Sequence, residues 1–263
     1  MSKLKDKLRE WFDCIVVALS VAMCFRAYFF EPFNIPTGSM QPTLWGNYAV
    51  EGGKFKGAWD VPVLSILKWL WTGEKFAEYK APASGIVGAM PRNDGFADMF
   101  VGNAYAGFKL PAEAAQGLLG RRVRKGETIW RGNVVTGDFI LVNRWKWNFW
   151  KPKSGEVVVF STTGIGRSES GECPGADGAR YAVQQGIHFI KRLKATPGET
   201  YQLEHPVPNR PTEVTMGEDE YFACGDNFNN SNDSRYWGPV PGTHLLGTGS
   251  VVFWPFSRWR AIK

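Results

Sequence analysis

Residues 31–44 of the chain read Glu-Pro-Phe-Asn-Ile-Pro-Thr-Gly-Ser-Met-Gln-Pro-Thr-Leu and directly follow its longest apolar run. Pro36 and Pro42 restrict φ on either side of Ser39, and with Gly38 they disfavour a regular helix or a central strand. We therefore expect a rigid loop over this stretch. A serine held on such a loop is a candidate nucleophile, although a Thr-Gly-Ser turn is also common without a catalytic role. Which alternative holds depends on whether the rest of the chain supplies a base.

The apolar run covers residues 11–30 and is broken only by Asp13 and Arg26 near its ends. As a helix it would reach roughly 30 Å, the thickness of the hydrocarbon core of a bilayer. The basic segment before it, residues 1–10, predicts a cytoplasmic tail and places the rest of the chain outside the cytoplasm. A cleavable signal peptide is the alternative, but no clear small-x-small cleavage site follows the run. We expect an uncleaved transmembrane anchor.

The composition favours a mainly β protein at a membrane surface. A chain of 263 residues with 30 glycines, 16 prolines and 14% aromatic residues suits strands and turns better than a helical bundle. The net charge of +6 fits either nucleic acid or an anionic membrane. Because there is no zinc-finger spacing, arginine-rich helix or RNA-binding aromatic motif, we expect no nucleic-acid partner. The 12 tryptophans, several of them beside Lys or Arg, favour the membrane interface.

Cysteine and histidine are too scattered to form an obvious metal site. The four cysteines include no closely spaced pair, and the three histidines lie far apart in the sequence. We therefore expect neither a metal nor another cofactor. Cys173 and Cys224 could form a disulfide bond if they are exported, but the sequence does not show whether their Cα atoms come close enough.

Strand patterns are clearest after residue 137. We expect strands over residues 138–143, 187–193 and 250–254, and a turn followed by a continuous apolar strand over 154–160. Residues 144–151 are aromatic and basic, which favours contact with lipid headgroups, although a strand partly packed in the core is the alternative. Residues 225–238 form a dense polar loop.

Residues 46–136 carry weaker signals. Residues 61–72 are too short to span a bilayer, and their paired tryptophans fit an interfacial segment or a buried core element equally well. Residues 81–107 indicate short strands and loops, and residues 111–119 a short helix. No chemical motif is evident in this part of the chain.

A candidate base lies within residues 187–193, where Lys191 interrupts an apolar strand pattern. Side chains alternate across a strand, so Lys191 shares a face with Phe189 and Leu193. Burial disfavours the ammonium form and lowers the pKa, so a buried lysine can act as a neutral general base. The alternative is an edge strand whose lysine extends to water.

Histidine is the commoner partner of a nucleophilic serine. His188 falls on the opposite face from Lys191, while His205 and His244 lie in irregular segments. None of them has a supporting pattern. A Ser-x-x-Lys motif is also excluded at Ser39, because Pro42 occupies the lysine position.

Five blocks occur in a characteristic order: residues 33–44 with Ser39, 137–142, 155–160, 189–192 with the following Pro197-Gly198, and 225–238. In this order they resemble the bacterial type I signal peptidases. The resemblance implies a membrane-anchored serine endopeptidase with a Ser–Lys dyad on a mainly β fold. Such an enzyme removes signal peptides after small residues at the first and third positions before the scissile bond.

The resemblance also implies residue roles. Ser39 would be the nucleophile, Lys191 the general base, and the Thr37 hydroxyl and Ser39 N–H the oxyanion hole. Ser231 would orient Lys191. The last block would be held together by Asp226, Asp233 and Arg235. Shallow apolar pockets for the substrate would be lined by Phe33, Ile35, Met40, Phe189 and Ile190.

The expected organisation is a β catalytic domain over residues 31–45 and 137–263, interrupted by an insertion of unknown role over residues 46–136. The implied location is the bacterial cytoplasmic (inner) membrane, crossed once, with the catalytic domain on the outer side. The implied partners are signal peptides, the lipid bilayer and the protein-export machinery. One departure from the family is Phe228-Asn229, where an Arg-Asp pair is usual. An inactive peptide-binding homologue and a processing peptidase with one dedicated substrate are the alternatives.

Overall fold

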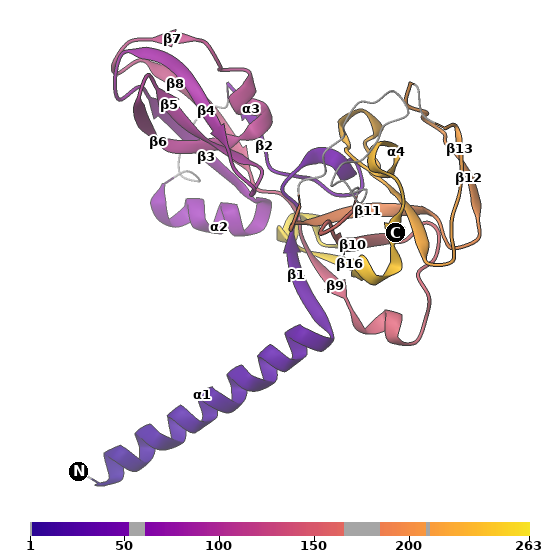
Figure 1. The fold of residues 1–263 in the computed structure, drawn as a ribbon. Helices are drawn as coiled ribbons and strands as arrows, with labels where there is room; N and C mark the ends of the chain where they lie inside the picture. The colour runs from indigo at the N-terminus through magenta and orange to yellow at the C-terminus, as the bar shows by residue number, and fades with distance from the viewer. Residues whose placement is uncertain (1, 53–60, 166–184, 209–210) are drawn as a thin grey trace.

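Helix α1, Ser2–Tyr28, leads into strand β1, Phe30–Asn34, and projects away from the rest of the protein (Figure 1). The computed structural model describes residues 2–52, 61–165, 185–208 and 211–263. Within α1, Arg9–Tyr28 is long and apolar enough to cross a membrane, with a mean hydropathy of 1.5 and none of it buried. The predicted apolar helix is therefore present, although it ends at Tyr28 rather than at residue 30.

The prediction of a rigid loop over residues 31–44 is wrong for the first part of this stretch, which belongs to β1. This strand pairs antiparallel with β9, Phe139–Asn143, and lies at the edge of its sheet. Proline has no backbone N–H to donate to a neighbouring strand. Pro32 is tolerated there because one side of an edge strand has no neighbouring strand to bond. Further along, the stretch is irregular and includes the short 3₁₀ helix η1, Gly38–Met40.

The main sheet has eight strands and contains β1 and β9. The other strands are β10 Val157–Ser161, β11 His188–Ala195, β14 Glu220–Cys224, β15 Val240–Pro241, β16 Leu245–Trp254 and β17 Arg260–Ala261. Their order is β1-β9-β16-β10-β11-β14-β15, with β17 paired to β16, and the pairs are antiparallel. The predicted mainly β fold is confirmed.

Strands β10 and β11 lie inside this sheet. Residues 157–160 are all buried, as their continuous apolar run predicts. β11 pairs with β10 on one side and with β14 on the other, and Lys191 is opposite Val158. The alternative of an edge strand with an exposed lysine is therefore wrong.

The C-terminal strand prediction, residues 250–254, is too short. β16 begins at Leu245, and β17 follows it. Gly247 and Gly249 weaken the strand pattern in the sequence, but Gly247 is needed for packing. A Cβ atom there would lie 2.6 Å from Val142 Cγ1, so only glycine allows β9 to approach this closely.

The described residues between 46 and 136 include two smaller antiparallel sheets. The first contains β2 Tyr48–Glu51, β8 Thr128–Val135 and β3 Glu74–Lys80, and the second contains β6 Ala104–Pro111, β5 Phe96–Val101, β4 Gly85–Pro91 and β7 Arg122–Val123. A separate apolar core, which includes Met99, Leu110 and Trp130, holds them together. The short helix α3 is Ala112–Gln116. The short strands and helix expected here are present.

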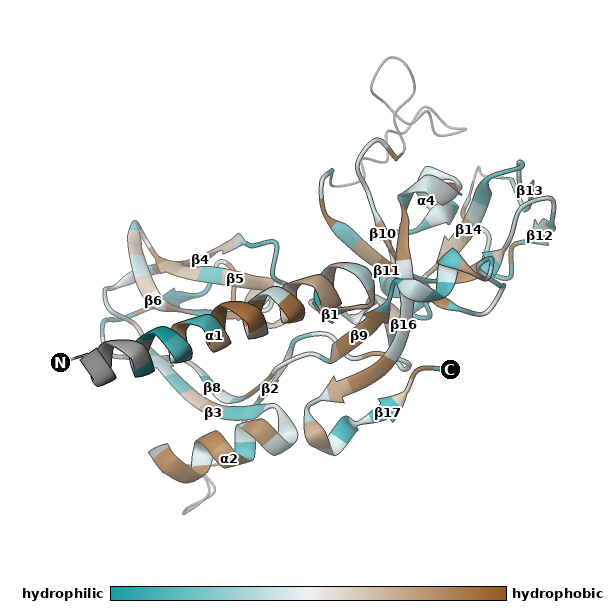
Figure 2. Ribbon diagram, turned by 90° about the horizontal axis from the view of Figure 1, so that it is seen from below, coloured by the Kyte–Doolittle hydropathy of each residue, from teal (hydrophilic) through white to brown (hydrophobic). Residues whose placement is uncertain are grey.

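Helix α2, Pro62–Thr72, ends at Gly73, whose left-handed φ of 73° terminates it. It is not a core element, because most of its apolar side chains face solvent, including Val63 at 73% and Ile66 at 58%. Figure 2 shows its largely hydrophobic ribbon at the margin of the molecule. Trp69 packs against Trp254 with ring centroids 4.8 Å apart. The buried alternative is thus wrong, and the interfacial one stays a prediction.

The aromatic and basic stretch over residues 144–151 is not a strand either. It forms the 3₁₀ helix η3, Trp145–Asn148, next to the end of α1. Trp145 stacks on Phe29 with ring centroids 4.6 Å apart, and Phe149 and Trp150 remain exposed. An aromatic cluster therefore surrounds the point where α1 meets the sheet.

The remaining elements are short. They are β12 Thr200–Gln202, β13 Glu213–Thr215, α4 Ser234–Trp237, η4 Phe228–Asn230, η5 Gly242–His244 and η6 Phe256–Arg258. Cys224 is buried and has a free thiol. Cys173, the other half of the disulfide considered above, lies outside the described residues.

Candidate active site

Ser39 sits in the turn η1 and is only 8% exposed. The polar loop that follows β14 holds this turn. The backbone N–H of Asn227 donates to the Ser39 carbonyl (3.0 Å), and Asn227 Nδ2 donates to the Gly38 carbonyl (3.1 Å). The serine is therefore fixed by residues far away in the sequence as well as by its neighbouring prolines.

Lys191 reaches Ser39 from the middle of β11. Its Nζ lies 2.7 Å from Ser39 Oγ, and the side chain is buried at 4% exposure. Leu193 and Ala195, on the same face of the strand, are also buried, as the alternation predicts. The structure thus brings together the two residues that the sequence singled out from positions 152 apart.

The surroundings of Lys191 favour its neutral form. Burial lowers the pKa of Lys191 to about 8, and the nearby carboxylate of Asp233 opposes that shift only in part. A lysine with this pKa is neutral in a substantial fraction of molecules near physiological pH. Positioned at hydrogen-bond distance from a serine hydroxyl, it can accept the proton of that hydroxyl.

Thr37 lies beside the pair, with Oγ1 3.5 Å from Ser39 Oγ. Because Thr37 has extended backbone angles and precedes the η1 turn, its hydroxyl and the Ser39 N–H belong to one short segment. Two donors on one segment can converge on a single oxygen atom, which is the arrangement that an oxyanion hole requires.

Ser231 lies in the same region as Ser39. Its Oγ is buried and has no hydrogen-bond partner among the described residues. Gly225 separates it from the Ser39 turn, because a Cβ atom on Gly225 would lie 2.3 Å from Ser231 Oγ and 2.5 Å from the Ser39 carbonyl oxygen. Only glycine fits between the two serines. The role of Ser231 in orienting Lys191 stays a prediction.

Asp233 and Arg235 form a buried ion pair at 2.8 Å. Asp233 caps α4 by accepting from the Arg235 N–H, and it also accepts from the Gly225 N–H (3.0 Å). Arg235 donates to the Phe228 carbonyl (2.9 Å). The pair therefore fixes the loop between β14 and α4, which contains Gly225.

Asp226 pairs with Arg192, whose role the sequence did not reveal. Arg192 Nε and Nη2 each donate to the Asp226 carboxylate at 2.8 Å, and Nη2 also donates to Thr43 Oγ1 (3.2 Å). Burial alone would raise the pKa of Asp226, but the hydrogen bonds and charge of Arg192 outweigh it, so that this pKa lies below its ordinary value. The sequence did place Arg192 on the face of the strand opposite Lys191, and this position was the one feature that could have suggested a partner for Asp226 there.

The five predicted pocket residues fall in two neighbouring clusters. Ile35 and Met40 are fully buried, and the half-buried Phe33 and Ile190 pack against the same cluster. Phe189 is half-buried and packs against the other cluster, which contains Phe160 and Leu193. Ile35 and Met40 can therefore form only the floor of a pocket, whereas the other three retain exposed surface.

The three histidines make contacts away from Ser39 and Lys191. The His188 ring contacts Phe33 edge-on, the His205 ring lies 4.0 Å from that of Phe228, and His244 Nε2 lies 2.8 Å from the Thr163 carbonyl oxygen. Each is thus engaged outside the Ser39–Lys191 pair.

Phe228, where the resemblance implies an arginine, packs between cationic side chains. The guanidinium carbon of Arg235 lies 5.3 Å from the ring centroid, and Lys194 Nζ lies 5.5 Å from it. Cation–π contacts of this kind contribute roughly 0.5–1 kcal/mol at exposed sites. The aromatic ring therefore gives Arg235 a contact in addition to its ion pair with Asp233.

The chain is similar to known proteins. The sequence profile of the family described as signal peptidase, peptidase S26, matches residues 8–58, 130–206 and 204–254. The chain belongs to this family. Residues 59–129 lie outside the matched segments, and the described part of this range contains α2, α3 and strands β3 to β7.

Individual members of the family resemble parts or most of the chain. A probable signal peptidase I-1 of Synechocystis is 33% identical over 141 residues, which cover 47% of this chain and 65% of that protein, less than two thirds of its length. Signal peptidase I of Pseudomonas aeruginosa is 26% identical over 260 residues. The matched region covers 94% of this chain and 74% of the Pseudomonas protein. A crystal structure of signal peptidase I from Enterococcus faecalis aligns with 38% of this chain and 97% of the Enterococcus chain, with a TM-score of 0.24 and 22% identity.

Proposed function

We propose that this protein is a membrane-anchored serine endopeptidase that cleaves N-terminal signal peptides from exported preproteins after small-x-small residues. The observation that carries the proposal is the buried pair Ser39 and Lys191, with Oγ and Nζ 2.7 Å apart, in a chain of the signal peptidase family. Ser39 is the nucleophile and Lys191 the general base.

The reaction follows from this geometry. Neutral Lys191 accepts the Ser39 proton as Oγ attacks the scissile carbonyl carbon, and the carbonyl oxygen becomes an oxyanion. The Thr37 hydroxyl and the Ser39 N–H donate to that oxygen, each contributing on the order of 3 kcal/mol. The Lys191 ammonium then protonates the leaving amine, and an ester on Ser39 remains. Lys191 next accepts a proton from the water that hydrolyses the ester, and it returns a proton to Ser39.

The preference for small residues has a steric basis. Ile35 and Met40 are buried, and they leave little depth beneath the substrate. Phe33, Phe189 and Ile190 provide the exposed apolar walls. A shallow apolar pocket accepts alanine-sized side chains and excludes larger ones, because closely packed cores do not expand at low cost. In this mechanism Ser231, Asp226, Asp233 and Arg235 support the site rather than touch the substrate.

α1 anchors this site in the bilayer. It crosses the cytoplasmic (inner) membrane once, with residues 1–10 in the cytoplasm and the catalytic sheet on the outer side. Trp145, Phe149 and Trp150 gather next to the end of α1, where aromatic residues are favoured at a membrane interface. Such a site lies where signal peptides emerge, and its partners are signal peptides, the bilayer and the protein-export machinery.

The orientation predicts a specific protease-protection pattern. In intact spheroplasts, an external protease should degrade the catalytic sheet while an epitope placed before Ser2 stays protected, because only the sheet lies outside. Immunoblotting with and without membrane lysis measures this. In the same preparation, a photoactivatable lipid should label α2 if that helix lies at the interface. Digestion of the N-terminal epitope before lysis would contradict the orientation.

Cleavage of purified preproteins tests the function. The full chain in detergent should cleave several unrelated preproteins after small-x-small sequences, and Phe in place of Ala at the first or third position before the scissile bond should prevent cleavage. Mass spectrometry of the products locates the cut.

Two other functions would give different results in this assay. Cleavage of one preprotein alone would indicate a processing peptidase with a dedicated substrate. Binding without cleavage would indicate an inactive peptide-binding homologue. The intact pair of Ser39 and Lys191 argues against the latter, because binding requires no activated nucleophile.

A further inference from the structure

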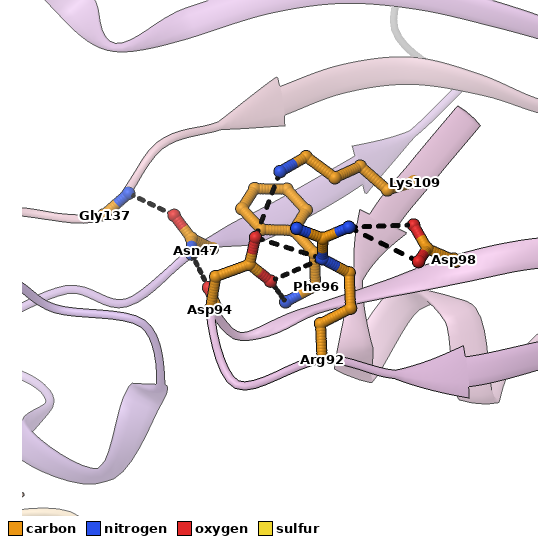
Figure 3. Close-up of polar contacts among 7 residues, drawn as sticks. All are labelled: Asn47, Arg92, Asp94, Phe96, Asp98, Lys109 and Gly137. Atoms are coloured by element: carbon orange, nitrogen blue, oxygen red, sulfur yellow. Dashed lines mark hydrogen bonds and ion pairs between the residues drawn. The ribbon is translucent and has the colours of Figure 1, made fainter. Parts of the chain in front are cut away.

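Asn47 is a buried polar residue that joins three separate stretches of chain (Figure 3). Its backbone N–H donates to the Pro36 carbonyl (3.2 Å), and its Nδ2 donates to the Asp94 carbonyl (3.0 Å). Its Oδ1 accepts from the Gly137 N–H (2.8 Å). At 5% exposure these groups have little access to water, so losing their partners is costly. Asn47 thus ties the turn between β4 and β5 to the residue that precedes Thr37.

The same turn touches Pro36 directly through Gly95. This glycine has a φ of +78°, and a Cβ atom on it would lie 2.3 Å from the Pro36 carbonyl oxygen. Its own carbonyl accepts a hydrogen bond from the Ala112 N–H (3.0 Å), so the turn is also held from α3. The backbone of the turn therefore lies against the peptide that joins Pro36 to Thr37.

Asp94 stabilises the shape of the turn. Its carboxylate accepts from the Phe96 N–H (3.2 Å) and pairs with Arg92 (3.3 Å) and Lys109 (3.1 Å), as Figure 3 shows. These groups come from the turn, β5 and β6. The turn is consequently held by the small sheet itself, and it presents a fixed surface to Pro36.

Gly46 packs against Thr37, the next residue after Pro36. A Cβ atom on Gly46 would lie 2.2 Å from the Thr37 carbonyl carbon. Pro36 is therefore in close contact with Gly95 and Thr37 with Gly46, and Asn47 is bonded to both Pro36 and the turn. Neither Pro36 nor Thr37 can shift without displacing one of these contacts.

We infer that the turn between β4 and β5 of the inserted segment positions the Thr37 hydroxyl for the reaction, with Asn47 and Gly95 as positioning residues. The inference rests on the proposed function, in which Thr37 stabilises the oxyanion. Positioning matters because a displacement of about 1 Å can reduce the rate on the order of 100-fold. The inserted segment thereby acquires a role in catalysis although it supplies no reacting group.

Gly95→Ala tests the inference, with Gly120→Ala as the matched control. Gly120 belongs to the same segment and has a φ of +79°, but a Cβ atom added to it would meet no atom within 4 Å. Both variants therefore incur the same backbone strain, and only Gly95→Ala presses on Pro36. In the preprotein assay, kcat of Gly95→Ala should fall about 10- to 100-fold with little change in KM, while Gly120→Ala retains the wild-type kcat.

The Thr37→Val background separates positioning from general damage. Thr37→Val alone should lower kcat by roughly 100- to 1000-fold, the usual loss for one oxyanion donor. If the turn acts through the Thr37 hydroxyl, Gly95→Ala should have almost no further effect in this background. Asn47→Ala, which introduces no clash, should behave in the same way and serves as the second variant if Gly95→Ala does not fold.

The outcomes are distinguishable. A wild-type kcat in both positioning variants, or an equal fall in kcat with and without the Thr37 hydroxyl, overturns the inference while the proposed function stands. A wild-type chain that cleaves no preprotein overturns the proposed function, and the inference with it. Thermal unfolding of each variant, followed by circular dichroism, reports whether the variant is folded.

Discussion

Lys191→Ala is expected to abolish preprotein cleavage while the protein stays folded. The amine of Lys191 is the titratable group placed 2.7 Å from Ser39 Oγ, and its loss leaves the nucleophile without a base. General-base catalysis contributes on the order of 10²- to 10⁴-fold, so the remaining rate should fall to the limit of detection. Ser39→Ala should be equally inactive, because the two residues act as one unit. Cleavage of a preprotein in detergent, followed by gel electrophoresis, measures both variants.

Lys194→Ala is the matched control for that experiment. Lys194 lies on the same strand but is half-buried, and its Nζ pairs with Glu204 at 3.4 Å and lies over the Phe228 ring, so it does not take part in the Ser39–Lys191 pair. It should retain most of the activity, which would show that β11 tolerates the loss of a lysine side chain. Turnover by Lys191→Ala at a rate comparable with that of Lys194→Ala would end the dyad proposal.

The pH dependence of kcat/KM adds an independent measure of the same group. As the pH falls below about 8, an increasing fraction of Lys191 is ammonium and cannot accept a proton, whereas above this pH most of it is the free amine. Activity should therefore rise with pH through about 8, well below the ordinary lysine pKa of about 10.4. A rise centred near the ordinary histidine pKa of about 6.5 would instead indicate a histidine base.

Among the variants proposed for unfolding measurements, Asp233→Ala is expected to cause the largest decrease in the free energy of unfolding. Asp233 is fully buried, and its removal leaves the Arg235 guanidinium unpaired, the Gly225 N–H without its acceptor and α4 without its cap. Breaking a buried ion pair on one side typically costs roughly 3–5 kcal/mol. Urea unfolding of the full chain in detergent, followed by circular dichroism, measures the change in the free energy of unfolding.

Two further variants define the cause of that loss. Arg121→Ala removes one partner of an exposed ion pair with Glu127, and it should shift the unfolding midpoint much less. The double variant Asp233→Ala, Arg235→Met should be more stable than Asp233→Ala alone, because the unpaired cation is gone. An Asp233→Ala protein as stable as Arg121→Ala would show that the buried pair does not hold the loop.

Local patterns were sufficient for the elements whose residues repeat with a clear period. The apolar run predicted α1, the continuous apolar residues of β10 predicted its burial, and alternation placed Lys191 on the apolar face of β11. Patterns failed where packing overrides propensity. Pro32 entered a strand because that strand is at an edge, and Gly247 lies within a strand because β9 comes too close for a side chain.

The contacts that complete the candidate site could not be predicted in the same way. Arg192 bonds Asp226 and Thr43, and Asn227 bonds the turn that contains Ser39. Each of these bonds joins residues that lie far apart in sequence, so no local repeat of side chains predicts it. A resemblance could assign a role to Asp226, but not its partner Arg192.

The sequence by itself determined an apolar segment long enough for a bilayer, a mainly β fold, and a serine and a lysine suited to form a pair. Those properties depend on residue type and on the periodicity of neighbouring side chains. Only the tertiary structure decided that Lys191 Nζ lies 2.7 Å from Ser39 Oγ, and that Gly95 of the inserted segment lies against Pro36. The physical reason is that both contacts join residues far apart in the sequence, so they depend on how the whole chain folds and not on any local pattern.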